Sequence, residues 1–363
     1  MSSSATERVR GSLASTSQKG SPVTDLPVVD QTDRLIAASL QVNGRASWGQ
    51  VARVLGITER TAARRGQRLL DEHIVRVSVS IDATRVAHAR PMLLRLTTES
   101  ESLWPVARLL ASRPDASSVS VLEGGNQIAG LLLLRDQDAI RRFLFEELAA
   151  MPGVRLTNAT TVLKFFRTGY DWHPGLLDDD HVRQLRSTLI TPSAEGDTRA
   201  ALALTPDEEA IVAALGEDGR TPISTLATRL SLAPATVKKR LDSLLERGYV
   251  HVRTEVLPEV FGLGLEVLLW LRAPVGELDR IGRRLSLMPE VKFCAASTGT
   301  SPILANLLVK DEAALYELLT GEVFAGLSQL EVVDHLVVVT PVLRGSLRVD
   351  DGPPLRLAVP SET

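Results

Sequence analysis

The amino-acid sequence predicts an α+β protein that is built from two copies of the same unit. The first observation is a repeat, because a shift of 175 residues places Gly44-Arg45 on Gly219-Arg220. Without a gap, the same shift also places Ala52 on Ala227, Leu55 on Leu230, Thr61 on Thr236, Arg65 on Arg240, Leu69 on Leu244 and Val75 on Val250. The other two observations are that each copy begins with three segments of helical periodicity and continues with segments of strand periodicity. Together they predict two winged helix-turn-helix domains, each followed by a ferredoxin-like βαββαβ domain.

The three-helix pattern is clearest in the second copy. Its segment 205–208 reads Thr-Pro-Asp-Glu, a capping box with proline at the first helical position, and it predicts a helix that starts at 206. Thr221-Pro222 predicts the start of a second helix, and an apolar stripe predicts a third helix over 234–247. In the first copy we expect the helices over 30–40, 47–55 and 58–71. The period then falls to about two, which predicts strands over 75–81 and 250–256.

Each copy continues with the order βαββαβ. The expected elements are 92–96, 102–111, 117–122, 128–134, 138–148 and 154–166, and then 265–271, 278–286, 291–296, 303–309, 312–323 and 330–342. This order predicts a four-stranded antiparallel sheet with two helices on one face. Because segments such as GLLLL (130–134) and LVVVT (336–340) are apolar, we expect the other face of each sheet to be paired with a second sheet.

Composition shifts along the chain predict its domain boundaries. Residues 1–27 are rich in Ser, Thr and Gly, which predicts a disordered tail. Residues 168–203 mix helix breakers, an acidic cluster and one short helical stretch, which predicts a connector. The remaining ranges are a first head over 28–75, a first sheet module over 76–167, a second head over 204–250, a second sheet module over 251–349 and a C-terminal tail over 350–363.

Composition also excludes several classes of protein. The formal net charge of −3 argues against a generally basic binder, so any affinity for nucleic acid has to come from local patches. Cys294 is the single cysteine and lies in an apolar segment, which predicts a core residue and no disulfide framework. The six histidines lack metal-ligand spacing, and we expect no metal, no cofactor and no catalytic residue. Without an apolar run of roughly 18 residues or a signal-peptide core, we expect a cytoplasmic protein with no membrane partner.

The third helix of each head carries the residues that point to function. In a helix-turn-helix this helix enters the major groove, with its N-terminal residues near the base edges. Window 58–70 holds four arginines and one glutamate, and window 233–247 holds four basic and two acidic residues. Arg60, Arg64 and Arg68 recur every fourth residue, so they are expected on one face, opposite the packing face. The predicted contacts to double-stranded DNA are Thr58, Glu59, Arg60, Thr61, Arg64, Arg65 and Arg68, and Ala235, Thr236, Lys238, Lys239 and Arg240. The alternative is that these charges are only the solvated faces of amphipathic helices.

The two heads differ in their expected cores. The first has Gly66 where the second has Leu241, and a glycine within a helix costs about 1 kcal/mol relative to alanine. We therefore expect the first head to be more loosely packed and the second to be better folded. Trp48 and Trp270 are interpreted as core or interface anchors.

At this point the residues carry a family resemblance. The stretch DEEAIVAALGEDGRTPISTLATRLSLAPATVKKRLDSLLERGYV and, more weakly, DRLIAASLQVNGRASWGQVARVLGITERTAARRGQRLLDEHIV, each followed by a sheet module, resemble the Lrp/AsnC (feast/famine) family. The resemblance covers nearly the whole chain except the tail and the connector. It implies a sequence-specific DNA-binding transcriptional regulator that is a covalent pseudo-dimer with two non-identical heads. It also implies sheet modules that pair back to back and through which the chain forms homo-oligomers.

The resemblance further implies a site for a small-molecule effector. Many family members bind an amino acid or a related molecule where the modules meet, near a Gly-Asp-Tyr/Phe-Asp turn between the second and third strands. The corresponding turns here are 124–127 (Gly-Gly-Asn-Gln) and 299–302 (Gly-Thr-Ser-Pro), which keep the first glycine and lack both aspartates. The implied effector contacts are Gly124, Gly125, Asn126, Gly299, Thr300 and Ser301. The alternative is that these residues only form hairpin turns.

Two other functions are compatible with the same architecture. Siroheme decarboxylases share the combination of heads and sheet modules, and they use histidine and arginine in the cavity between the modules. The corresponding strands of this chain contain no evident cluster of that kind. The third hypothesis is a ligand-sensing or scaffolding protein whose heads no longer bind DNA.

Overall fold

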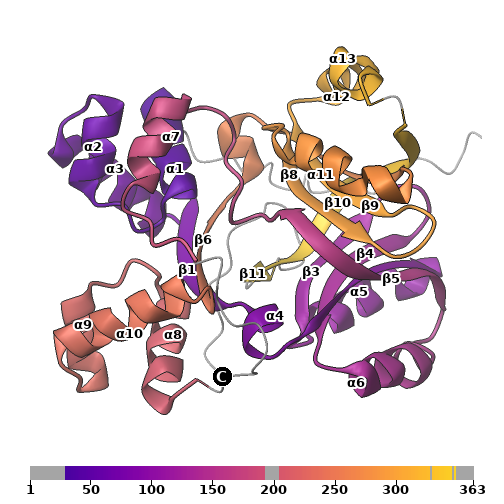
Figure 1. Ribbon diagram of the computed structural model, residues 1–363, viewed down its shortest axis with the longest axis horizontal. Coiled ribbons are helices and arrows are strands. Elements are labelled where there is room, and N and C mark those ends of the chain that lie inside the picture. The colour runs from indigo at the N-terminus through magenta and orange to yellow at the C-terminus, as the bar shows by residue number, and fades with distance from the viewer. Residues whose placement is uncertain (1–28, 193–203, 328, 346, 349–363) are drawn as a thin grey trace, which may run out of the picture.

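The computed structural model describes residues 29–192, 204–327, 329–345 and 347–348. The tails expected over 1–27 and 350–363, and the connector beyond 192, lie outside the described residues. Within the described part the α+β prediction is confirmed, with two helical heads on one side of the molecule and two sheet modules on the other (Figure 1). No described helix is long and apolar enough to span a membrane.

The first head consists of α1 (Gln31–Val42), α2 (Trp48–Leu55) and α3 (Glu59–Asp71). Each helix begins after an N-cap, Asp30, Ser47 or Thr58, whose side chain accepts a hydrogen bond from the third helical N–H. The connector adds α7 (Asp179–Arg186), which packs on α1 and α2. Gln50 Nε2 donates to the carbonyl of Gln184 at 2.9 Å. The described part of the connector is therefore a fourth helix of the first head.

The second head consists of α8 (Pro206–Glu217), α9 (Ile223–Leu230) and α10 (Pro234–Glu246). The capping box predicted between Thr205 and Glu208 is present. The helix expected to start at Thr221-Pro222 begins at Ile223, and Thr221 is not its N-cap. Pro222 has an extended backbone and occupies the N-cap, while Thr221 Oγ1 donates to the carbonyl of Asp218 at 2.9 Å.

A two-stranded antiparallel ribbon joins the two copies and lies between the heads (Figure 1). Its strands, β1 (Val75–Ile81) and β6 (Val250–Val256), have the predicted bounds. Ser78 lies opposite Arg253, and because these positions differ by the repeat distance of 175, the pseudo-twofold axis passes through this pair. Helix α8 packs on β1 and α1 packs on β6. Each head is therefore packed against the strand of the other copy.

The sheet modules follow the predicted βαββαβ order. The first contains α4 (Ala83–Val86), β2 (Arg90–Thr98), η1 (Ser100–Ser102), α5 (Leu103–Ala111), β3 (Ala116–Leu122), β4 (Gln127–Leu134), α6 (Gln137–Arg142), η2 (Phe143–Glu147) and β5 (Val154–Arg167). The second contains η3 (Pro258–Phe261), β7 (Leu265–Arg272), η4 (Val275–Glu277), α11 (Leu278–Ser286), β8 (Val291–Ser297), β9 (Ile303–Val309), α12 (Glu312–Thr320), α13 (Glu322–Ala325), β10 (Glu331–Arg344) and β11 (Leu347–Arg348). The helix expected over 312–323 breaks at Gly321, and the helix expected over 138–148 ends in a π-helical turn.

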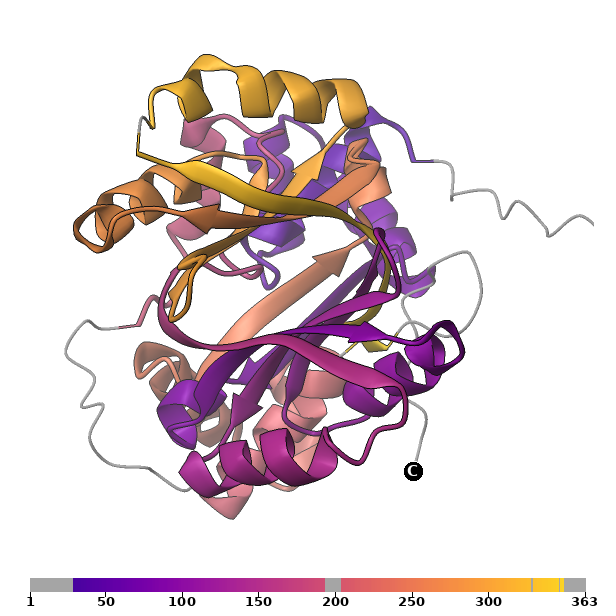
Figure 2. The same cartoon turned by 90° about the vertical axis from the view of Figure 1, so that its right-hand side faces the viewer.

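The two sheets join at their edges and close into a barrel. The strand order is β11-β10-β3-β4-β2-β5-β8-β9-β7, and β10 also pairs with β7. Strand β5 of the first module thus pairs with β8 of the second, and β10 of the second pairs with β3 of the first. The module helices lie outside this barrel (Figure 2). The apolar sheet faces are covered, as expected, but edge-to-edge closure turns them inward within one chain. Assembly of several chains through the sheet modules stays a prediction.

Gly66 has a packing role that the sequence did not reveal. A Cβ on this residue would lie 2.2 Å from Cζ3 of Trp48, so the glycine leaves room for the indole ring. The guanidinium of Arg220, from the second head, lies 4.2 Å from the centre of the same ring. The expectation of a loosely packed first head was wrong, because Trp48 fills the space that a larger residue occupies in the second head.

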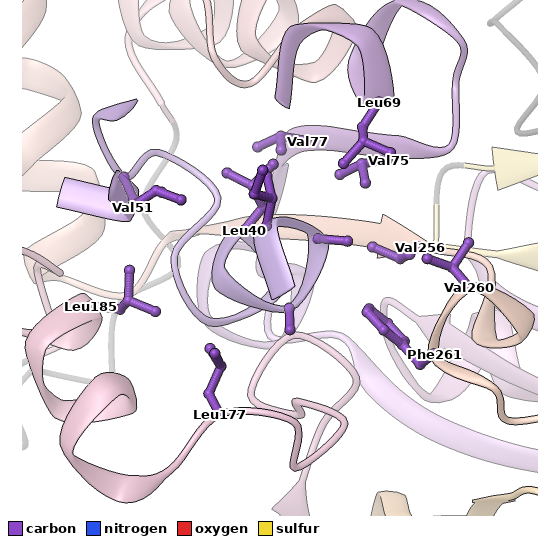
Figure 3. Close-up of a cluster of buried hydrophobic side chains, with 14 of the residues drawn as sticks. Leu40, Val51, Leu69, Val75, Val77, Leu177, Leu185, Val256, Val260 and Phe261 are labelled. Atoms are coloured by element: carbon purple, nitrogen blue, oxygen red, sulfur yellow. The ribbon is translucent and has the colours of Figure 1, made fainter. Parts of the chain in front are cut away.

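The core of the first head combines segments that are far apart in the sequence (Figure 3). Leu40 and Leu69 from its own helices pack with Leu185 of the connector and with Val256 and Phe261 of the second copy. All five side chains are at most 8% exposed. The first head therefore depends for its folding on both halves of the chain.

Candidate functional site

The N-terminal half of α3 presents the exposed basic residues of the first head. Glu59, Arg60 and Arg64 are exposed, and Thr61 is half-buried. Thr58 is exposed as well, but its hydroxyl is the N-cap of the helix. Arg60 and Arg64 form no ion pair with any residue that the structure describes. Their guanidinium groups are thus available to an external anion or base edge.

Two other arginines of α3 are tied to α1 instead. Arg65 pairs with Asp30 at 2.6 Å and with Asp33 at 3.1 Å, and Arg68 pairs with Asp33 at 2.6 Å. The backbone N–H of Asp33 and the Arg65 guanidinium lower the pKa of Asp30. The prediction that Arg68 shares an outward face with Arg60 and Arg64 was wrong, because the side chain of Asp33 is only 2% exposed and draws both arginines toward α1.

Helix α10 repeats this division in the second head. Lys239, which occupies the position of Arg64, is exposed and has no ion pair among the described residues. Arg240, at the position of Arg65, bonds to Asp207 at 2.8 Å and to Thr205 at 3.1 Å in α8 and its cap. Lys238 is exposed but pairs with Asp242 on its own helix. The two remaining predicted contacts are Ala235, which is exposed, and Thr236, which is half-buried.

The Gly-Arg pairs that revealed the repeat form the joint between the heads. Arg220 donates to the carbonyls of Gly44 at 2.6 Å and Ala46 at 2.9 Å, and Arg45 donates in return to the carbonyl of Gly219. Burial, together with the charge of Arg45, lowers the pKa of Arg220 to about 10. A Cβ on Gly219 would lie 2.8 Å from the backbone of Ser78 in the ribbon. Sequence reasoning missed this joint, although the coincidence of two Gly-Arg pairs was its signal.

The turns expected to contact an effector lie where the modules meet. A Cβ on Gly124 would lie 3.2 Å from Leu336 of β10, and one on Gly299 would lie 2.9 Å from Thr160 of β5. Gly124, Gly125, Asn126 and Gly299 all have positive φ, which is the conformation of tight hairpin turns. Of the six predicted residues, only Ser301 lines the cavity within the barrel.

That cavity has a volume of about 260 Å³ and is lined by both modules and by the end of the ribbon. The charged side chains in its wall include Arg253 and Glu255 of β6, Glu266 of β7, Lys292 of β8 and Arg344 of β10. Sequence reasoning missed them. The sequence feature that could have indicated these residues is a single charged residue inside an otherwise apolar strand, as in LEVLLWL (265–271) and VKFCAA (291–296).

The cavity wall contains one histidine. His251 bonds to Asp82 at 2.9 Å and stacks on Tyr170 with ring centres 4.3 Å apart. Among the described residues no cluster of His, Cys, Asp and Glu could hold a metal ion. Cys294 is buried as predicted, and burial raises the pKa of its thiol to about 12.

Solved structures match most of the chain, including both heads and both sheet modules in their extent. The siroheme decarboxylase NirDL aligns with a TM-score of 0.56 and 13% sequence identity, over 88% of this chain and 94% of that protein. Its complex with an iron-uroporphyrin III analogue aligns with a TM-score of 0.53 and 15% identity, over 82% of this chain and 87% of that protein. At this level of identity the likeness concerns the fold alone.

The sequence comparisons identify both heads. Residues 29–70 match the AsnC-type helix-turn-helix domain, and residues 208–251 match a winged helix-turn-helix DNA-binding domain. An uncharacterised HTH-type transcriptional regulator of Pyrococcus abyssi is 25% identical over 143 residues, which are 39% of this chain and 90% of that protein. The Bkd operon transcriptional regulator of Pseudomonas aeruginosa is 25% identical over 140 residues, 38% of this chain and 92% of that protein. The chain thus carries two helix-turn-helix domains, the first of the AsnC type, and its sequence is similar to that of HTH-type transcriptional regulators.

Proposed function

We propose that the chain is a transcriptional regulator whose two non-identical heads bind two different half-sites of one DNA duplex. The observation that carries this proposal is the placement of Arg60, Arg64 and Lys239. All three are exposed on the third helices and free of ion pairs within the described residues. Such groups bind phosphates and guanine edges.

The joint between the heads supports simultaneous binding of both half-sites. The β1–β6 ribbon and the reciprocal bonds of Arg45 and Arg220 hold the heads to each other. Rigidly joined heads bind two half-sites at a fixed spacing along the duplex. A covalent pseudo-dimer therefore recognises one composite site.

The differences between the third helices support unequal half-sites. Where the first head has Arg60 and Arg64, the second has Ala235 and Lys239. Arginine can bond to guanine through two parallel hydrogen bonds, whereas lysine acts as a point charge. We therefore expect the first head to be the more selective of the two.

Selection of binding sites from a random duplex library, with the full chain as bait, tests this proposal. Two dissimilar half-sites at one spacing are the expected result. A perfect palindrome would contradict non-identical recognition, and no enrichment over bulk DNA would favour the ligand-sensing or scaffolding function. Affinity should also fall steeply between about 50 and about 200 mM salt, because phosphate contacts release counterions.

We further propose that a small molecule bound between the sheet modules regulates the heads. The barrel cavity and the ribbon support this, since Arg253 and Glu255 of β6 line the cavity while Val256, on the same strand, packs in the core of the first head. A ligand that changes the conformation of β6 would act on both copies, because β6 pairs with β1 and packs against α1 of the first head. Thermal unfolding of the full chain with a panel of small metabolites, followed by DNA titration with each hit, tests this part.

A siroheme decarboxylase activity is the second candidate, and the fold likeness to NirDL favours it. The cavity wall offers a single histidine, His251, which is bonded to Asp82. Titration of the full chain with siroheme decides this question. A shifted Soret band and conversion of siroheme would establish the enzyme, and an unchanged spectrum would leave the regulator as the function.

A further inference from the structure

Lys292 carries a half-buried amine without a partner in the barrel wall. Its side chain lines the barrel cavity, and its Nζ forms no ion pair or hydrogen bond with the residues that the structure describes. The register of β8 against β9 shifts between Val291 and Phe293. Lys292 and Phe293, which are neighbours in the sequence, both line the cavity next to this irregularity.

The charges around Lys292 do not balance. Arg344 and Glu266 form one ion pair, and Arg253 and Glu255 form another at 3.0 Å. Lys292 is the third cation of this cluster, which holds two anions. The two other charged residues of the cavity wall have partners of their own, since Arg95 pairs with Asp334 and Asp82 bonds to His251. Burial, followed by the charge of Arg344, lowers the pKa of the Lys292 amine. A partly desolvated cation without an ion-pair partner is unfavourable, so the site is complementary to one additional negative charge.

Asn306 supplies a second unsatisfied group in the same wall. Its Nδ2 donates to Glu266 at 2.9 Å, while its buried Oδ1 has no hydrogen-bond partner in the described structure. Asn306 is 8% exposed and lines the cavity. The Oδ1 atom is an acceptor, so a ligand that satisfies it has to bring a donor.

We propose that the barrel cavity binds a small 2-hydroxy carboxylate with an apolar side chain. Its carboxylate accepts a hydrogen bond from Lys292, and its 2-hydroxyl group donates to Oδ1 of Asn306. Its side chain packs against Trp270 and Phe293, which line the same cavity with Leu268.

Charge and size select this class among related ligands. A 2-hydroxy acid brings one net negative charge and neutralises the cluster, whereas a zwitterionic amino acid leaves the excess positive charge in place. The cavity of about 260 Å³ lies below the roughly 300–1,000 Å³ of pockets that enclose drug-sized ligands. It therefore suits one small acid better than a tetrapyrrole.

This proposal names the ligand class for the effector part of the proposed function and rests on that function only for its effect on the heads. The route to the heads is short. Arg253 and Glu255 face the cavity, while Thr254 between them donates through Oγ1 to the carbonyl of Leu40 in α1 at 2.6 Å. Occupancy of the cavity thus acts on the strand that carries the first head.

Isothermal titration of the full chain with 3-phenyllactate, in the absence of DNA, tests the site directly. We expect saturable binding that weakens at least about tenfold in Lys292→Met, because a charge-assisted hydrogen bond is lost. The matched control is Lys310→Met, since Lys310 is mostly exposed, and it should bind like the parent. The amide 3-phenyllactamide, which lacks the negative charge, should bind as weakly to the parent as 3-phenyllactate binds to Lys292→Met.

The Asn306→Ala variant tests the proposed hydrogen bond to the 2-hydroxyl group independently of Lys292. The parent should prefer 3-phenyllactate over 3-phenylpropionate, which lacks the hydroxyl group, and this preference should disappear in the variant. Absence of saturable 3-phenyllactate binding to the parent, or equal binding by the Lys292→Met variant with its fold confirmed by circular dichroism, would overturn the proposal. Because this titration contains no DNA, failure of the heads to bind DNA leaves its result intact.

Discussion

Arg64 and Arg65 are neighbours in α3, and they should respond in opposite ways to substitution by alanine. Arg64 is exposed and has no ion pair in the described structure, so Arg64→Ala should change the free energy of unfolding by less than about 0.5 kcal/mol. If Arg64 contacts a base or phosphate, its loss should cost about 1–3 kcal/mol of binding free energy, which is roughly a 5- to 150-fold rise in Kd. A lost phosphate contact should also reduce the salt slope by about 1.

Arg65→Ala is the matched contrast. It removes two ion pairs between α3 and the start of α1 and leaves the buried Asp33 with Arg68 alone, so it should lower the melting temperature. Fluorescence anisotropy on the selected duplex at several salt concentrations, together with thermal unfolding followed by circular dichroism, separates the two effects. The reasoning is refuted if Arg64→Ala unfolds as early as Arg65→Ala, or if Arg64→Ala binds the duplex with the parent's Kd and salt slope.

Two further predictions follow from packing and from charge. Gly66→Ala should destabilise the protein by about 1–3 kcal/mol, because the new Cβ would lie 2.2 Å from Trp48. Gly216→Ala is the control within a helix. Its Cβ meets no atom closer than 3.6 Å, so this substitution should stabilise the protein by up to about 1 kcal/mol. Urea unfolding measures both, and stabilisation by both substitutions would show that Trp48 does not need the space. The affinity for 3-phenyllactate should fall as pH rises through the pKa of Lys292, which lies below its usual value of 10.5, because only the ammonium donates to the carboxylate with a full charge. Titration calorimetry between about pH 6 and pH 9.5 follows this change. A pH-dependent affinity that persists in Lys292→Met would assign it to another titratable group of the cavity wall, which also holds Asp82, Tyr170 and His251.

Local patterns in the sequence were enough to predict the helices and strands and their order along the chain. The strands over 75–81 and 250–256 were predicted at their observed bounds, because a change of period from helix to strand is written in adjacent residues. The caps at Asp30, Ser47 and Thr205 are also local, since each side chain bonds to a backbone N–H three residues later.

Contacts between distant segments could not be predicted in the same way. Nothing in β1 alone indicates that it pairs with β6, and nothing in the sheet edges indicates that β5 joins β8. The outward face of α3 was misjudged for a similar reason, because the buried Asp33 that attracts Arg65 and Arg68 lies more than thirty residues earlier. The prediction for Gly66 was based on helix propensity alone, whereas this residue contributes to packing by leaving space for the indole ring of Trp48.

Hydroxyl-radical footprinting of one DNA site with the parent chain, Arg64→Ala and Lys239→Ala tests most directly whether the two heads read separate halves of that site. Each substitution should remove protection from a different half while the other half remains protected. Loss of the same protected segment in both variants, or full protection in both, would contradict two distinct DNA-reading heads in one chain.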